Sequence, residues 1–93
     1  MELKKILKNI DFKLKNGSLN KNITEVKYDS REIKKDNLFI AISGFKADGH
    51  QFIDQAVKNG ARTVMIEKEL ADYQSGVSYI KVENSRKAMA QLA

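Results

Sequence analysis

Apolar residues recur along the chain at two different spacings, which separate the expected helices from the expected strands. A spacing of three to four residues predicts helices over residues 2–9, 50–59 and 84–92. Alternation, or an unbroken apolar run, predicts strands over 23–28, 38–42, 62–67 and 77–82. Between them we expect a polar loop over 15–22 and a short helical turn over 69–73.

The order of these elements predicts the fold class. Strand 38–42, helix 50–59 and strand 62–67 form a strand–helix–strand unit, which nearly always joins two parallel strands by a right-handed crossover. A further strand and helix follow. We therefore expect an α/β fold, with a small, mainly parallel sheet flanked by helices. The last helix reaches Ala93 without a stop signal, which favours a piece of a longer protein.

Composition narrows the chemistry that the chain can carry. Its 93 residues suit one domain. The absence of cysteine and the single histidine leave no disulfide, no thiolate or histidine-rich metal site and no cysteine nucleophile. No phosphate-loop or dinucleotide-binding glycine motif occurs, so neither catalytic residues nor a metal site are expected here. Without a signal peptide or a membrane-length apolar run, we expect a cytoplasmic protein with no membrane partner.

The positive charge is concentrated near the start of the chain. Residues 1–35 hold ten Lys and Arg against five Asp and Glu, whereas residues 36–93 hold seven of each. The excess is typical of a solvated basic face, or of attraction to a nucleotide or a nucleic acid. A nucleic-acid module would need aromatic side chains interleaved with Lys and Arg on a strand, and none are placed so.

Two loops follow the carboxyl ends of predicted strands, where open α/β sheets bind ligands. One spans 28–31 and the other spans 43–50. If strands 23–28 and 38–42 are neighbours, these loops face each other. The sequence therefore predicts one binding site at this edge of the sheet.

The side chains of these loops suit a nucleotide. The Ser30 hydroxyl can both donate and accept, as the edge of uracil requires. Tyr28 or Phe45 can lie against a base ring, and Lys46 can pair with a phosphate. Structural alternatives stay open, because Ser30 can serve a turn, Phe45 the core and Lys46 the solvated surface.

Five neighbouring residues are expected to support these loops. Asp29 and Arg31 are expected to bind each other or the backbone. Asp48 is a plausible N-cap of the helix over 50–59, and Gly49 closes the loop before it. His50 is interpreted as a structural residue of the first helical turn, because neither a base nor a nucleophile accompanies it.

The ordered motifs resemble the N-terminal domain of the Mur ligases. The resemblance covers about residues 23–67 and is carried by Tyr28-Asp29-Ser30-Arg31, Asn37 to Gly44, Asp48 to Ile53 and Gly60-Ala61, with the tail from Val82 to Ala93 extending it. It implies that residues 1–93 form the domain that binds the UDP end of a UDP-N-acetylmuramoyl-peptide. By motif position, Tyr28 and Ser30 would contact the uridine, and Phe45, Lys46 and Ala47 would form the facing loop.

The same resemblance implies an ATP-dependent amide ligase of peptidoglycan synthesis as the parent protein. Its central and C-terminal domains would supply the ATP and magnesium sites and lie outside this chain, so no cofactor is expected in these 93 residues. The loop around Lys46 and the tail at Ser85 are most similar to the member that adds the third residue of the stem peptide. The member that adds D-Ala-D-Ala is the alternative within the family. A basic nucleic-acid-binding module and a protein-interaction domain are the alternatives outside it.

Overall fold

The computed structural model describes residues 1–43 and 48–91. Three of the predicted site residues, Phe45, Lys46 and Ala47, therefore lie outside the described residues, as does Leu92. In chain order the elements are α1 (Leu3–Ile6), β1 (Lys13–Asn16), β2 (Val26–Lys27), the 3-10 helix η1 (Ser30–Glu32), β3 (Leu38–Ile40), the 3-10 helix η2 (Gly49–Phe52), α2 (Ile53–Asn59), β4 (Thr63–Ile66), β5 (Ser78–Lys81) and α3 (Ser85–Gln91).

The strands form one sheet in the order β1-β5-β4-β3-β2. Strands β2 to β5 are parallel to their neighbours, and only β1 runs antiparallel, along β5. The predicted class, a small and mainly parallel sheet flanked by helices, is confirmed. The pairing of β2 with β3 also confirms that the two strands before the candidate loops are neighbours.

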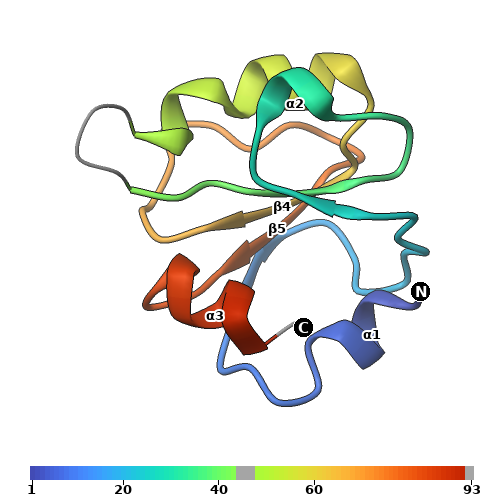
Figure 1. The fold of residues 1–93 in the computed structure, drawn as a ribbon, viewed down its shortest axis with the longest axis vertical. Helices are drawn as coiled ribbons and strands as arrows, with labels where there is room; N and C mark the ends of the chain where they lie inside the picture. The colour runs from blue at the N-terminus through green and yellow to red at the C-terminus, as the bar shows by residue number, and fades with distance from the viewer. Residues whose placement is uncertain (44–47, 92–93) are drawn as a thin grey trace.

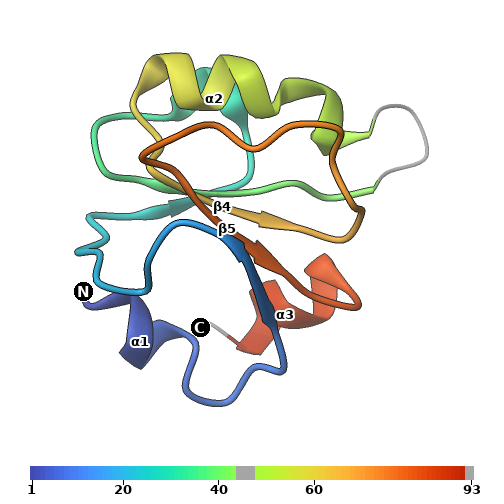
Figure 2. The ribbon, with the colours of Figure 1, turned by 180° about the vertical axis from the view of Figure 1, so that it is seen from behind.

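Helices cover both faces of the sheet (Figure 1), with α2 on one face and α1 and α3 on the other. The view from behind shows the same three layers (Figure 2). Because neighbouring residues of a strand point to opposite faces, Phe39 packs in the cluster beneath α2, while Leu38 and Ile40 pack in the cluster against α1 and α3. Because β3 is buried on both faces, its sequence is an unbroken apolar run.

Several predicted elements are shorter than expected, and one strand was missed. The helix expected over 2–9 is the single turn α1, and the strand expected over 23–28 is the two-residue β2. Strand β1 lies partly in the segment expected to be a polar loop. Its sequence, Lys-Leu-Lys-Asn, has one apolar residue, and its pairing comes from hydrogen bonds to β5 rather than from an apolar face.

The prediction of a helical turn over 69–73 is wrong. The backbone there forms no helix, and the Tyr73 hydroxyl accepts a hydrogen bond from the Leu70 backbone N–H at 3.3 Å and donates one to the Glu69 carboxylate at 3.0 Å. Leu70 and Tyr73 pack against the cluster beneath α2. The apolar residues that suggested a helix therefore anchor an irregular loop to the core.

The predicted helix boundaries are confirmed at three points. Asp48 caps η2, which leads directly into α2, by accepting a hydrogen bond from the His50 backbone N–H at 3.0 Å. Gly60 ends α2 with a φ of 127°, a conformation that disfavours any side chain. Asn84 caps α3, since its Oδ1 accepts from the Lys87 backbone N–H at 3.0 Å.

Candidate functional site

A cavity of about 660 Å³ opens at the carboxyl ends of β2 and β3, where the two candidate loops meet. This volume lies in the usual range for small-molecule sites. Helix α2 contributes to the cavity from one face of the sheet and α3 from the other. The described lining residues are Tyr28, Asp29, Ser30, Arg31, Phe39, Ile42, Gly49, Phe52, Gln55, Arg86 and Met89.

Ser30 is held in place by helix α2. It begins the 3-10 helix η1 and is 5% exposed. Its hydroxyl donates to Oε1 of Gln55 at 2.8 Å, and its carbonyl accepts from Nδ2 of Asn59 at 3.0 Å. Because the hydroxyl proton is donated to Gln55, the Ser30 oxygen keeps its lone pairs as acceptors.

Gln55 lies beside Ser30 in the cavity wall and was not predicted from the sequence. Its amide oxygen is occupied by Ser30, and its amide nitrogen makes no hydrogen bond to any residue among 1–43 and 48–91. In the sequence it is one of several polar residues on the exposed side of a helix, so no local signal distinguishes it. Together Ser30 and Gln55 present an acceptor and a donor side by side.

Asp29 and Arg31 bind each other, as expected. The Asp29 carboxylate accepts from Nε of Arg31 at 3.0 Å and from NH2 at 2.8 Å, and it also caps η1 through the Arg31 backbone N–H. The Arg31 guanidinium and this backbone hydrogen bond lower the pKa of Asp29 to about 2. The pair stabilises the turn that contains Ser30. The Asp29 carboxylate also neutralises the charge of Arg31 within this turn.

Gly49 holds the described end of the second loop against the backbone that follows β3. A Cβ atom at Gly49 would lie 2.6 Å from the Ile42 backbone nitrogen, so this close approach of two backbone segments requires glycine. The Gly49 N–H donates to the Ile42 carbonyl at 2.8 Å. The described end of the loop thus reaches the cavity.

The His50 side chain does not line the cavity. Its ring is 7% exposed, with Nδ1 2.7 Å from Oδ1 of Asp48 and Nε2 accepting from the Glu67 backbone N–H at 2.9 Å. The Lys68 ammonium, the His50 backbone N–H and the His50 ring hold the pKa of Asp48 well below its usual range. This arrangement agrees with the structural role expected for His50.

Glu67 positions the α3 side of the cavity. Its carboxylate accepts from the Ser43 hydroxyl at 2.9 Å and from the Ser85 backbone N–H at 2.6 Å. It therefore ties the ends of β3 and β4 to the start of α3. Arg86 and Met89 project from this helix to the cavity, and Arg86 makes no ion pair within the described part of the chain.

Aromatic rings supply apolar surface in the same cavity. Tyr28 and Phe52 are 66% and 40% exposed, which is unusual for such large side chains in this domain, and Phe39 is buried behind them. Tyr28 was predicted as a base contact. Phe52 shares helical spacing with Ile53, Ala56 and Val57, but it ends η2 and lies outside the buried face of α2.

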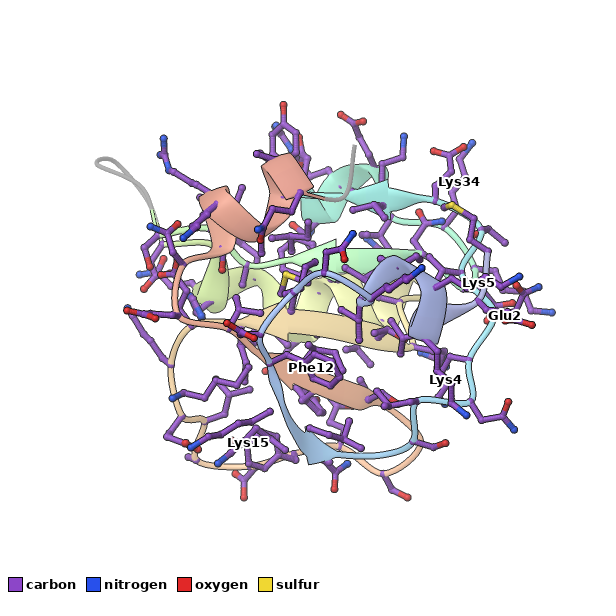
Figure 3. All side chains as sticks on the ribbon, turned by 90° about the horizontal axis from the view of Figure 1, so that it is seen from below. Glu2, Lys4, Lys5, Phe12, Lys15 and Lys34 are labelled. Carbon is purple, nitrogen blue, oxygen red and sulfur yellow. The ribbon has the colours of Figure 1, made fainter. Side chains whose placement is uncertain are left out.

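Three lysines of the first third, Lys5, Lys15 and Lys27, form ion pairs with carboxylates. Lys15 pairs with Glu69 and Lys27 with Glu25, each at 2.9 Å. Figure 3 shows Lys4 and Lys5 of α1 reaching outward on one side of the molecule and Lys15 reaching outward elsewhere, while Phe12 lies against the sheet. These ion pairs agree with the solvated-face interpretation of the charge.

The described residues offer no group of three or more His, Cys, Asp and Glu side chains able to hold a metal ion. Within those same residues no helix is long and apolar enough to cross a membrane. The sheet topology is that of a small open α/β domain, and in such sheets ligands bind beyond the carboxyl ends of the parallel strands.

Comparison with known proteins gives the family. Residues 22–93 match the model described as "Mur ligase family, catalytic domain". The UDP-N-acetylmuramoyl-L-alanyl-D-glutamate--2,6-diaminopimelate ligases of Clostridium tetani and Oceanobacillus iheyensis are 41% and 45% identical over 100% of the chain. The chain belongs to the Mur ligase family, and it spans about a fifth of the length of these relatives, 20% and 19%.

Solved structures confirm the fold. The UDP-N-acetylmuramoylalanyl-D-glutamyl-2,6-diaminopimelate--D-alanyl-D-alanyl ligase of Acinetobacter baumannii matches 97% of this chain with a TM-score of 0.75 and 22% identity, over 19% of its own length. The MurF ligase of Thermotoga maritima, solved in complex with ADP, matches 73% of this chain with a TM-score of 0.63 and 31% identity, over 15% of its own length. These matches confirm the N-terminal domain type that the motifs predicted.

Proposed function

We propose that the cavity at the carboxyl ends of β2 and β3 binds the uridine diphosphate end of a UDP-N-acetylmuramoyl-peptide. The observation that carries the proposal is the pairing of Ser30 and Gln55 at 2.8 Å inside a cavity bounded by aromatic rings. Uracil is a flat ring with polar atoms along one edge. An acceptor and a donor beside apolar surface match that chemistry.

The phosphates are assigned to the open side of the cavity. Arg86 lines it from α3, and Arg31 lines it while paired with Asp29, so Arg86 is the cation with the greater freedom to bind an anion. We propose that Phe45, Lys46 and Ala47, which lie outside the described residues, form the facing loop of the nucleotide site, with Lys46 as a second phosphate contact.

For the parent protein we propose an ATP-dependent amide-bond ligase of peptidoglycan synthesis that acts in the cytoplasm. Further domains of the same polypeptide would carry the ATP and magnesium sites. The present domain would anchor the substrate far from the reacting bond. Its part in the reaction is then binding and orientation rather than chemistry.

The addition of the third stem-peptide residue is favoured over the addition of D-Ala-D-Ala. The diaminopimelate-ligase relatives are 41% and 45% identical over the whole chain. This sequence identity supports the assignment more strongly than the 22% identity to the D-alanyl-D-alanyl ligase, which shows the fold alone. We assign the amino acid added to the class named in these relatives, 2,6-diaminopimelate.

Replacement of Ser30 tests this function. Ser30→Ala should lower the affinity of the 93-residue chain for UDP about tenfold, because one buried polar contact is lost. Ser75→Ala, at an exposed turn residue, is the matched control and should leave affinity unchanged. UDP affinity that is unaffected by Ser30→Ala, with both variants folded, would refute the assignment.

In the full-length ligase the same substitution should raise the Michaelis constant for the UDP substrate more than it lowers turnover, since the contact is remote from the reacting bond. A collapse of turnover with unchanged substrate affinity would contradict an anchoring role.

A further inference from the structure

The amide nitrogen of Gln55 is the donor of the Ser30–Gln55 pair on which the proposed function rests. Its partner oxygen, Oε1, accepts the Ser30 hydroxyl proton at 2.8 Å. Because a side-chain amide oxygen can only accept, the Ser30 hydroxyl is the donor in this hydrogen bond. The nitrogen of Gln55 is left as a donor, and the oxygen of Ser30 is left as an acceptor.

We propose that Gln55 is a specificity-determining residue that selects uracil over cytosine, an inference that rests on the proposed function of the cavity. Uracil presents N3–H as a donor next to O4 as an acceptor. Cytosine presents N3 as an acceptor next to an amino group that donates. The pair of Ser30 acceptor and Gln55 donor matches uracil at both atoms and opposes cytosine at both.

The structural setting favours this role over a purely solvated glutamine. Gln55 lies on the exposed side of α2, yet it lines the cavity together with Ser30 and Phe52. Ser30 itself is 5% exposed, and its carbonyl is held by Asn59 of the same helix. Helix α2 thus sets both the position of the acceptor and the position of the donor.

The geometry also defines what substitutions should do. Gln55→Leu keeps a side chain of similar size and removes the donor, so uracil loses one hydrogen bond and cytosine loses an opposing group. Gln55→Glu keeps the oxygen that accepts from Ser30 and replaces the donor with a second acceptor. The new acceptor repels O4 of uracil and can accept a hydrogen bond from the amino group of cytosine.

Dissociation constants for UDP and CDP, measured by NMR titration of the 93-residue chain, test the inference. We expect the unsubstituted chain to favour UDP by about tenfold, the lower range for one mispaired base edge. Gln55→Leu should lower this UDP preference, and Gln55→Glu should lower it further, while the Ser30 acceptor still matches uracil in both variants. Gln51→Leu, at an exposed glutamine outside the cavity lining, is the matched control and should keep the UDP preference.

The outcomes separate the two levels of the account. If the unsubstituted chain binds neither nucleotide, the proposed function itself fails. If UDP binds but Gln55→Leu leaves the ratio of UDP to CDP unchanged, the function stands and the assignment to Gln55 is overturned. Equal affinity of the unsubstituted chain for UDP and CDP would equally overturn it.

Discussion

Nε2 of His50 accepts a hydrogen bond from the Glu67 backbone N–H at 2.9 Å, so this nitrogen carries no proton in the structure. The ring proton lies on Nδ1, which faces Oδ1 of Asp48 at 2.7 Å. Both ring nitrogens are therefore engaged. The sole histidine of the chain fastens the described end of the second loop to the end of β4, and it is not available as a general base.

Removal of this ring should lower stability rather than binding chemistry. His50→Ala leaves the Glu67 N–H without its acceptor, and we expect the free energy of unfolding to fall by about 1–3 kcal/mol. His50→Gln, whose side-chain oxygen can accept, should recover part of the loss. Urea unfolding measures both. Unchanged stability of His50→Ala together with lost UDP binding would show that His50 contacts the ligand.

Asp48 should make stability depend on pH in the acid range. Its pKa is held well below the usual range by the Lys68 ammonium first and by the His50 backbone N–H next. A depressed pKa in the folded state contributes stability that is complete above the ordinary carboxyl value of about 4 and is lost as the pH falls below it. Thermal unfolding from pH 6 down to pH 2 tests this.

The matched variants for that measurement are Asp48→Asn and Asp72→Asn. Asp48→Asn should be less stable near pH 6 and should lose less stability on acidification than the unsubstituted chain. Asp72 is exposed, and its substitution should leave the slope unchanged. Asp29, with a pKa of about 2, contributes the same background in all three proteins. Identical acid slopes for Asp48→Asn and the unsubstituted chain would contradict the account.

Two glycines with positive φ, Gly60 and Gly76, allow the cost of backbone strain to be compared with the cost of a steric clash. Gly60 has a φ of 127°, and a Cβ atom there would lie 2.9 Å from the backbone of Lys34 and Lys35. Gly76 has a φ of 83° with nothing within 4 Å. Gly76→Ala should therefore lower the free energy of unfolding by about 1 kcal/mol, from conformation alone.

Gly60→Ala should lower the free energy of unfolding by at least about 1 kcal/mol more than Gly76→Ala. The added Cβ atom would also push the backbone of Lys34 and Lys35 away from Gly60. Equal losses in urea unfolding would show that the close approach at Gly60 relaxes freely.

The sequence predicted the parallel sheet because residues 38–42 and 64–66 are unbroken apolar runs, and this pattern arises where helices cover both faces. It did not predict β1. A strand at the edge of a sheet takes its stability from hydrogen bonds to one neighbour, and Lys13–Asn16 contains little apolar surface to mark it. The apolar residues Leu70 and Tyr73 suggested a helix that does not form. Their side chains instead anchor an irregular loop to the core.

The site was predictable where local motifs carry it. Asp29, Ser30, Arg31 and Gly49 come to the cavity as the order of the strands requires. Gln55 and Arg86 were not assigned to it, because each reaches the cavity from a helix on a different face of the sheet. Their meeting depends on how α2 and α3 dock, and spacing along one sequence does not report that.

Arg86 should contribute to the binding of phosphate and not to the binding of the base. Arg86→Gln is expected to weaken UDP binding about tenfold, the scale of a charged hydrogen bond. Binding of uridine, which lacks phosphate, should change little. Lys87→Gln is the matched control, because Lys87 is exposed on the same helix and lies outside the cavity lining. Equal weakening of UDP and uridine in NMR titrations would instead make Arg86 a packing residue of the cavity.

Amide chemical shifts during a titration of the 93-residue chain with UDP report most directly on the central claim, that the carboxyl edge of β2 and β3 is the nucleotide site. The account predicts the largest shifts at Asp29 to Arg31, Gly49, Gln55 and Arg86. Shifts concentrated at the opposite edge, around Asn22 and Arg62, or no shifts at millimolar UDP, would contradict it.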